Sequence, residues 1–126
     1  MRLLVALSAL MLAVGLCTLL LWRWGRSREP SPCDSREIEE IASPGGRAQA
    51  DVFEVRCPGA VTTHVALRAA DKPAESRADV FVGLGAVPVR VVWSGDREIL
   101  IESMAARLLV GETRWREVSV RIRREK

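Results

Sequence analysis

The stretch VPVRVVWSGDREILIE, residues 87–102, predicts a β-hairpin and, with it, a fold built mainly from strands. Within residues 87–93 every odd position is apolar, so an extended backbone would place all four of these side chains on one face. S-G-D-R at 94–97 supplies turn residues, and the segment E-I-L-I-E continues the alternation after them. Because Pro88 has no N–H to donate, we expect this strand to start there or to lie at a sheet edge.

The same period of two recurs elsewhere in the chain. It is found in residues 50–57, 61–69, 79–86 and 116–124. In the last of these segments, Val118, Val120 and Ile122 share one face, opposite Arg121 and Arg123. S-P-G-G at 43–46 is typical of a turn, and the glycines within 79–86 indicate a bulge or an early end to that strand. These segments predict half-buried strands.

One segment departs from this pattern. IESMAARLLVGE, residues 101–112, is rich in helix formers, and Ile101, Met104 and Leu108 recur at helical spacing before a plausible stop at Gly111. We therefore expect a helical turn or a short helix between two strands here.

An uninterrupted apolar run, LLVALSALMLAVGLCTLLLW, occupies residues 3–22. Its length of about 20 residues is what a helix needs to cross a bilayer. A cleaved signal peptide has a shorter apolar core and a small-x-small site, and a lipoprotein signal needs a small residue where Leu16 precedes Cys17. Both alternatives remain open, but the run favours an uncleaved anchor. The residues that suit the membrane interface after it are Trp22, Arg23, Trp24 and Arg26.

The chain then divides into three parts. Residues 1–24 form the anchor, residues 25–35 a linker with two prolines and three serines, and residues 36–126 a single β-rich domain. The predicted fold class is mainly β, namely an N-terminal transmembrane helix followed by a small antiparallel sheet domain of five or six strands, with room for one short helix.

The orientation of the anchor has evidence on both sides. Arg23, Arg26 and Arg28 follow the apolar run and only Arg2 precedes it, which favours a cytoplasmic domain. The cysteines outside the run form an even pair, and such a pair in a small exported domain indicates a disulfide. Two unrelated buried cysteines are the alternative, and the residues alone leave this choice open.

Composition excludes some partners. The net charge is only +3, and basic residues are interleaved with acids rather than gathered into an aromatic-studded stripe, so we expect no nucleic-acid partner. The basic end at 121–126 would meet anionic lipid if it lay near a bilayer, but a solvated strand face is the favoured interpretation.

Candidates for chemistry are few. His64 is the only histidine and lacks metal-spaced partners, so we expect a solvated surface histidine. The acids at 37–40 and Asp51 are expected to be a solvated charge run, and Gly83 and Gly85 are too few for a phosphate loop. Cys57 and His64, with the threonines between them, have the residue types of a nucleophile and its base. A cysteine in a disulfide is not a nucleophile, however, so this pairing requires Cys57 to be reduced. We expect no catalytic residue, no metal and no cofactor.

The order of these elements resembles a group of small bacterial exported or membrane-anchored proteins of unknown function. That group runs Cys, S-P-D-G-K/R, C-G-A-T-T, S-T-x-V-S-I/L and V-x-V-x-W, and this chain has Cys33, S-P-G-G-R at 43–47, C-P-G-A-V at 57–61 and V-R-V-V-W at 89–93. Gly45 stands where the group has Asp. The resemblance implies a disulfide between Cys33 and Cys57 and a domain outside the cytoplasm, but no reaction.

Together these observations predict a single-pass protein of the cell membrane whose C-terminal domain is periplasmic or extracellular. We expect a non-enzymatic interaction or envelope accessory module with an unidentified protein partner, since an exposed sheet edge can capture another strand. Two alternatives stay open: a small ligand-binding protein or enzyme that uses the loop at 58–64, and an anchor protein that faces the cytoplasm.

Overall fold

The computed structural model describes residues 1–26 and 32–125, apart from the side chain of Arg26. The chain divides into two units, Met1–Ser31 and Pro32–Lys126. The first contains one helix, α1 (Arg2–Arg26), and the second contains all the strands.

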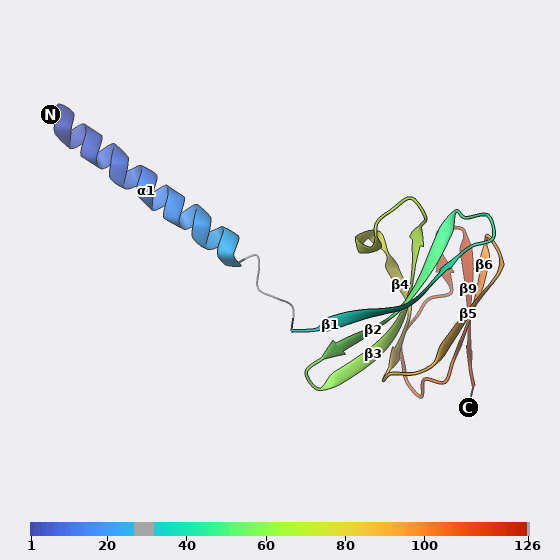
Figure 1. The fold of residues 1–126 in the computed structure, drawn as a ribbon. Coiled ribbons are helices and arrows are strands. Elements are labelled where there is room, and N and C mark those ends of the chain that lie inside the picture. Colours follow the sequence, from blue (N-terminus) through green and yellow to red (C-terminus); the bar gives the residue numbers. More distant parts are fainter. Residues whose placement is uncertain (27–31, 126) are drawn as a thin grey trace. The chain divides into compact units, whose positions relative to one another are not determined.

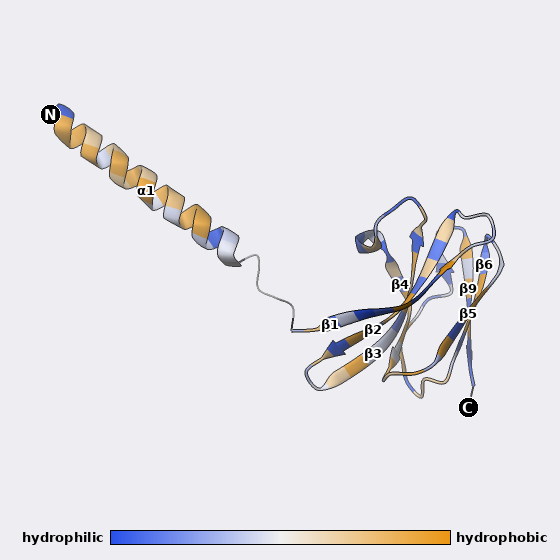
Figure 2. Ribbon diagram, viewed as in Figure 1, coloured by the Kyte–Doolittle hydropathy of each residue, from blue (hydrophilic) through white to orange (hydrophobic). Residues whose placement is uncertain are grey.

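α1 is mostly apolar along its length, with hydrophilic residues at its two ends (Figure 2), and none of its apolar window is buried against protein. At 25 residues it is about 37 Å long, so by length and composition it is able to cross a membrane. Its two hydroxyl groups bond back to the helix, with Ser8 donating to the Val5 carbonyl at 2.9 Å and Thr18 to the Gly15 carbonyl at 2.9 Å. The helix therefore presents few unsatisfied polar groups along its length.

The second unit is a sandwich of two sheets (Figure 1). Sheet A has the order β1-β2-β3-β4-β7, and sheet B has the order β5-β6-β9-β8. The strands are β1 (Asp34–Ala42), β2 (Ala48–Cys57), β3 (Ala60–Ala69), β4 (Ala78–Leu84), β5 (Val89–Gly95), β6 (Glu98–Ser103), β7 (Leu108–Gly111), β8 (Arg114–Trp115) and β9 (Val118–Arg124), with a 3-10 turn, η1 (Ala74–Ser76), before β4. All pairs are antiparallel except β6 with β9, which is parallel.

The expected fold class, mainly β behind an N-terminal apolar helix, is confirmed. The expected count of five or six strands in one sheet was too low, because the described residues form nine strands in two sheets. The predicted linker also extends too far, since Asp34 and Ser35 already pair with β2; of its remaining residues, 27–31 lie outside the described part of the chain.

The core lies between the two sheets and is filled by the alternating residues. Sheet A supplies Leu67 and Phe81, both fully buried, and sheet B supplies Ile99 and Ile101 at 1% and 0% exposure. The predicted hairpin at 87–102 is confirmed as β5 paired with β6, and β5 begins directly after Pro88 at the edge of sheet B. In β5 and β6 the period of two therefore identified the face that packs into the core.

The helix expected at 101–112 was wrong. This segment is the end of β6, a crossing and then β7, which pairs with β4 in the other sheet. Ala105 lies at the crossing, 3% exposed, and a Cβ added at Gly83 would come within 2.8 Å of the Ala105 Cβ. Close packing of this segment onto β4 outweighs a local helix propensity of only tenths of a kcal/mol per residue.

Two local features position the N-terminal half of sheet A. β2 and β3 are joined through Pro58 and Gly59, whose φ of 80° fits the third position of a type II turn. A disulfide joins Cys33 to Cys57, with 4.1 Å between the Cα atoms, so it ties the start of β1 to the end of β2. The edge strand β1 is thereby fixed to its neighbour covalently as well as by its ladder.

Candidate functional site

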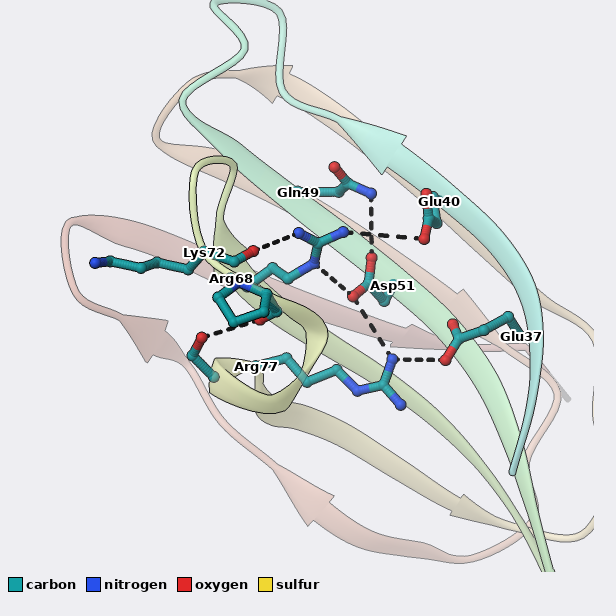
Figure 3. Close-up of polar contacts among 9 residues, drawn as sticks. Glu37, Glu40, Gln49, Asp51, Arg68, Lys72 and Arg77 are labelled. Atoms are coloured by element: carbon teal, nitrogen blue, oxygen red, sulfur yellow. Dashed lines mark hydrogen bonds and ion pairs between the residues drawn. The ribbon is translucent and has the colours of Figure 1, made fainter. Parts of the chain in front are cut away.

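The outer face of sheet A, which points away from the core, carries a connected set of polar contacts (Figure 3). At its centre lies Asp51 on β2, whose exposure is only 1%. Asp51 pairs with Glu40 on one side and with Ala66 on the other, and the small Ala66 side chain leaves room above it for larger groups. The strand alternation places the carboxylate here, between Ala50 and Val52, which point into the core.

Two arginines compensate the buried carboxylate. Arg68 Nε donates to Asp51 Oδ2 at 2.9 Å, and Arg77 Nη1 lies 3.6 Å from the same oxygen. Each arginine has a further partner: Arg68 donates to the Lys72 carbonyl at 2.7 Å, and Arg77 to Glu37 Oε1 at 2.7 Å. We call these residues, with Glu40 and Gln49, the outer-face network.

The prediction that Asp51 and the acids at 37–40 form a solvated charge run was wrong for Asp51. The physical reason is the segment between β3 and β4, which includes η1 and carries Lys72 and Arg77 over the sheet. Glu37 and Glu40 remain 48% and 59% exposed, as expected for an edge strand. They lie in β1, however, and not in a linker.

His64 lies next to this network on β3, and the expectation of a solvated surface histidine was also wrong. Its side chain is 14% exposed and stacks on Phe53, with 4.8 Å between the ring centroids. The Arg77 guanidinium lies over the Phe53 ring, 3.7 Å from its centroid. The Phe53 ring thus covers the imidazole of His64, which we expected to be exposed to solvent.

The contacts of His64 have the order of a hydroxyl–imidazole–carboxylate chain. Its Nε2 lies 2.8 Å from Thr62 Oγ1, and its Nδ1 lies 3.2 Å from Asp79 Oδ2. The second contact is at ion-pair distance but lacks the alignment of a hydrogen bond. In catalytic triads the carboxylate holds the imidazole through such a bond, so this cluster is not aligned as one.

A shallow, open hollow of about 450 Å³ lies beside this cluster. It is lined by Phe53, Val55, His64, Ala74, Glu75, Arg77 and Asp79. Thr62, the hydroxyl of the chain described above, is not part of the lining, and neither are the residues of the 58–61 turn. In the described residues, 1–26 and 32–125, no group of three or more His, Cys, Asp or Glu side chains is arranged to hold a metal ion.

The edge strands β1 of sheet A and β5 of sheet B differ in how they are protected from pairing with another strand. β1, at the edge of sheet A, has a bulge between Glu37 and Glu39 and leaves Ile38 48% exposed. Bulges and charged side chains are two of the devices by which edge strands avoid unwanted pairing. β5, at the edge of sheet B, is regular up to Trp93 and carries Val92 at 38% exposure. The structure thus places a bulge within the β1 edge and none between Val89 and Trp93 of the β5 edge.

The residues predicted for the membrane interface lie in the last turns of α1. Trp22 and Trp24 are 60% and 75% exposed in the last turns of the helix, with Arg23 between them. Arg26 is the last residue of α1, and its side chain lies outside the described residues. Cys33 and Cys57 are joined in the disulfide, as the resemblance implied.

Sequence reasoning missed the outer-face network. The available signal was an acid at Asp51, flanked by apolar residues within a strand, with an arginine on the matching face of the next strand. Comparison of the chain with protein-family models, with curated proteins and with solved structures gives no match.

Proposed function

We propose that this protein is anchored in a membrane by α1 and that its β-sandwich acts by binding a partner on the export side. The observation that carries the proposal is α1 itself: a helix of 25 residues with no buried apolar window, in a chain whose other unit already has its own core. An apolar surface of this size is stable only when it is covered, and a bilayer covers it on all sides.

The flanks of α1 support this placement. The indole rings of Trp22 and Trp24 suit the level of the lipid headgroups, where an apolar body and a polar N–H are both solvated. Arg23 reaches phosphate from the same turn. This half of the proposal is tested by alkaline carbonate extraction, which should leave the chain in the membrane pellet with Met1 still present by intact mass. Release of the chain by carbonate would refute it.

The disulfide supports the export side. Structural disulfides persist in oxidising compartments and are rare in the cytosol, so the Cys33–Cys57 bridge favours a domain outside the cytoplasm. The arginines that follow the apolar run at 3–22 favour the opposite orientation under the positive-inside rule, which keeps the cytoplasm-facing alternative open. Topology reporters fused after Lys126 decide between them. We expect only the export-active reporter to give signal, and a signal from the cytoplasmic reporter alone would overturn this orientation.

A binding role, and not catalysis, is supported by how the polar groups are used. Asp51, Arg68 and Arg77 satisfy one another, and the imidazole of His64 is stacked and partly covered. Photocrosslinking of the full chain in native membranes should capture a protein partner, and an incorporated crosslinker at Val92 should do so more efficiently than one at Ile38. Equal capture at both edges, or none, would argue against recognition through the sandwich edge.

The alternative of a small enzyme or ligand-binding protein rests on the chain from Thr62 through His64 to Asp79. Its test is the variant Thr62→Val, which removes the hydroxyl and keeps the β-branched shape. We expect partner capture to be unchanged in this variant. A hydrolytic activity of the full chain that disappears in Thr62→Val would favour the enzyme instead.

We also propose that this chain is related to the group of small exported bacterial proteins that it resembles in sequence. It is supported by the order of the turn at 43–46, the paired cysteines and the V-x-V-x-W strand, which the structure builds as the β1–β2 turn, the disulfide and β5. It supplies a compartment and no activity.

A further inference from the structure

A groove of about 300 Å³ lies at one end of the sandwich and does not share residues with the outer-face network. Three turns form its rim: the turn between β1 and β2, that between β5 and β6, and that between β8 and β9. Each turn contributes one arginine, namely Arg47, Arg97 and Arg116. The aromatic ring of Trp115 and the side chain of Val118 supply apolar lining.

The acids of the groove already have partners. Asp96 accepts a hydrogen bond from the Gly45 N–H at 2.6 Å, which ties two of the three turns together. A Cβ at Gly45 would overlap the Asp96 carboxylate, so this contact requires glycine. Glu117 lies 3.8 Å from Arg97. Among the residues that the structure describes, neither Arg47 nor Arg116 forms an ion pair, so the groove has uncompensated positive charge.

Arg116 has an unusual backbone. Its φ of 51° lies in the left-handed region, and it is the one residue other than glycine with a positive φ in the described ranges 1–26 and 32–125. A Cβ is unfavourable there, and glycine is the usual choice in a two-residue hairpin turn such as this one. The guanidinium of Arg116 lies over the Trp115 ring, 4.9 Å from its centroid, and both residues line the groove. Strained positions of this kind cluster at binding sites.

We propose that this groove binds a small organic anion, a carboxylate or a phosphate ester attached to a compact apolar body. The planar forks of Arg47 and Arg116 match either oxyanion, and the apolar lining from Trp115 and Val118 would contact the apolar part. The proposal rests on the binding role of the sandwich proposed above, but it needs neither the membrane anchor nor a particular orientation.

The test uses the full chain in nanodiscs of zwitterionic lipid, with benzoate, phenyl phosphate and inorganic phosphate as probes. The readout is the indole N–H resonance of Trp115, assigned with Trp115→Phe. We expect saturable shifts with a Kd on the order of 1 mM for at least one organic probe, and weaker binding of inorganic phosphate. Comparison of the Kd values for benzoate and phenyl phosphate identifies which oxyanion the groove prefers. No saturable shift with either organic probe would overturn the proposal.

Two variants distinguish a specific anion site in the groove from nonspecific attraction of anions by surface arginines. Arg116→Gly should weaken binding about tenfold, because a hydrogen bond to a charged group is lost. The same variant should unfold at a temperature no lower than the wild type, because glycine accepts the left-handed backbone. Arg121→Gln, which removes the same charge from the outer face of β9, should bind as the wild type does. Unchanged binding in Arg116→Gly, or an equal loss in Arg121→Gln, would overturn the proposal, while the topology result would stand.

Discussion

The outer faces of the two sheets carry similar residue types and use them in opposite ways. On sheet A, Asp51 is buried beneath Arg68 and Arg77, whose side chains are only 13% and 18% exposed. On sheet B, Glu102 pairs with Arg90 and Arg123, which are 77% and 62% exposed. The residue types and the strand pattern are alike, but the arginines of sheet A are covered, whereas on sheet B the Glu102 side chain is 18% exposed and its two arginines remain in water.

The difference comes from one connection. The segment between β3 and β4 lies over sheet A and supplies Arg77 and the Lys72 carbonyl, whereas sheet B has no such cover among the described residues. The arginines of sheet A make short contacts of 2.7 and 2.9 Å beside longer ones of 3.6 and 3.9 Å, whereas the two contacts of Glu102 on sheet B are 3.6 and 3.9 Å. Covered charges must be paired, whereas exposed ones are screened by solvent. Substitutions on the two faces should therefore have very different effects.

Asp51→Ala should have the largest effect. It leaves Arg68 and Arg77 covered and without their shared carboxylate, and breaking a buried ion pair in this way costs about 3–5 kcal/mol. Urea unfolding of the full chain in a mild detergent, followed by tryptophan fluorescence, measures it. The double variant Asp51→Ala/Arg68→Ala should be less destabilised than the sum of the two single variants. Strict additivity would show that the network is not coupled.

Loss of the disulfide should come next. Cys33 and Cys57 are 24 positions apart, and opening a loop of that length destabilises a domain by about 3 kcal/mol through the entropy of the unfolded chain. Cys33→Ser/Cys57→Ser, measured against the wild type in oxidised and reduced form, tests this. We expect the double variant to match the reduced wild type. Equal stability of the oxidised and reduced proteins would mean that the β1–β2 ladder alone holds this edge of sheet A.

Much of the fold was open to prediction because it depends on local alternation. Val118, Val120 and Ile122 were placed correctly on the inner face of β9 from their spacing alone. The partner of β9 was not predictable in the same way, since its parallel pairing with β6 joins segments separated by the crossing into the other sheet. The prediction of a helix at 101–112 was wrong for the same reason, because the neighbours of this segment in space, such as Gly83, are distant in sequence.

The polar cluster was harder to predict than the core. A period of two separates the faces of a strand, but it does not reveal whether the outer face meets water or another segment. Asp51 and His64 were therefore assigned to solvent, and the covering segment at 70–77 has no hydrophobic period to mark it. The positive φ of Arg116 had no signal in the sequence at all, because arginine is not a residue that favours it.

Arg77→Ala should have an intermediate effect on sheet A. Arg77 contributes a hydrogen bond to Glu37 and a cation–π contact to Phe53, which together amount to about 1.5 kcal/mol, and its loss also leaves buried Asp51 with Arg68 as its remaining arginine partner among the described residues. Arg77→Lys keeps the charge but loses the planar group that lies over the ring, so it should restore only part of this stability. The same urea measurement applies to both variants. Full restoration by lysine would show that charge alone, and not stacking, holds the covering segment.

The smallest effect should come from Glu102→Gln on sheet B. Its two contacts, at 3.9 Å to Arg90 and 3.6 Å to Arg123, join a partly covered carboxylate to exposed guanidinium groups. Such surface pairs contribute less than about 0.5 kcal/mol each, and salt screens them. Unfolding in low and high salt should bring Glu102→Gln and the wild type together, while Asp51→Ala should stay destabilised in both. If Glu102→Gln cost as much as Asp51→Ala, cover by the β3–β4 segment would not be what distinguishes the two faces.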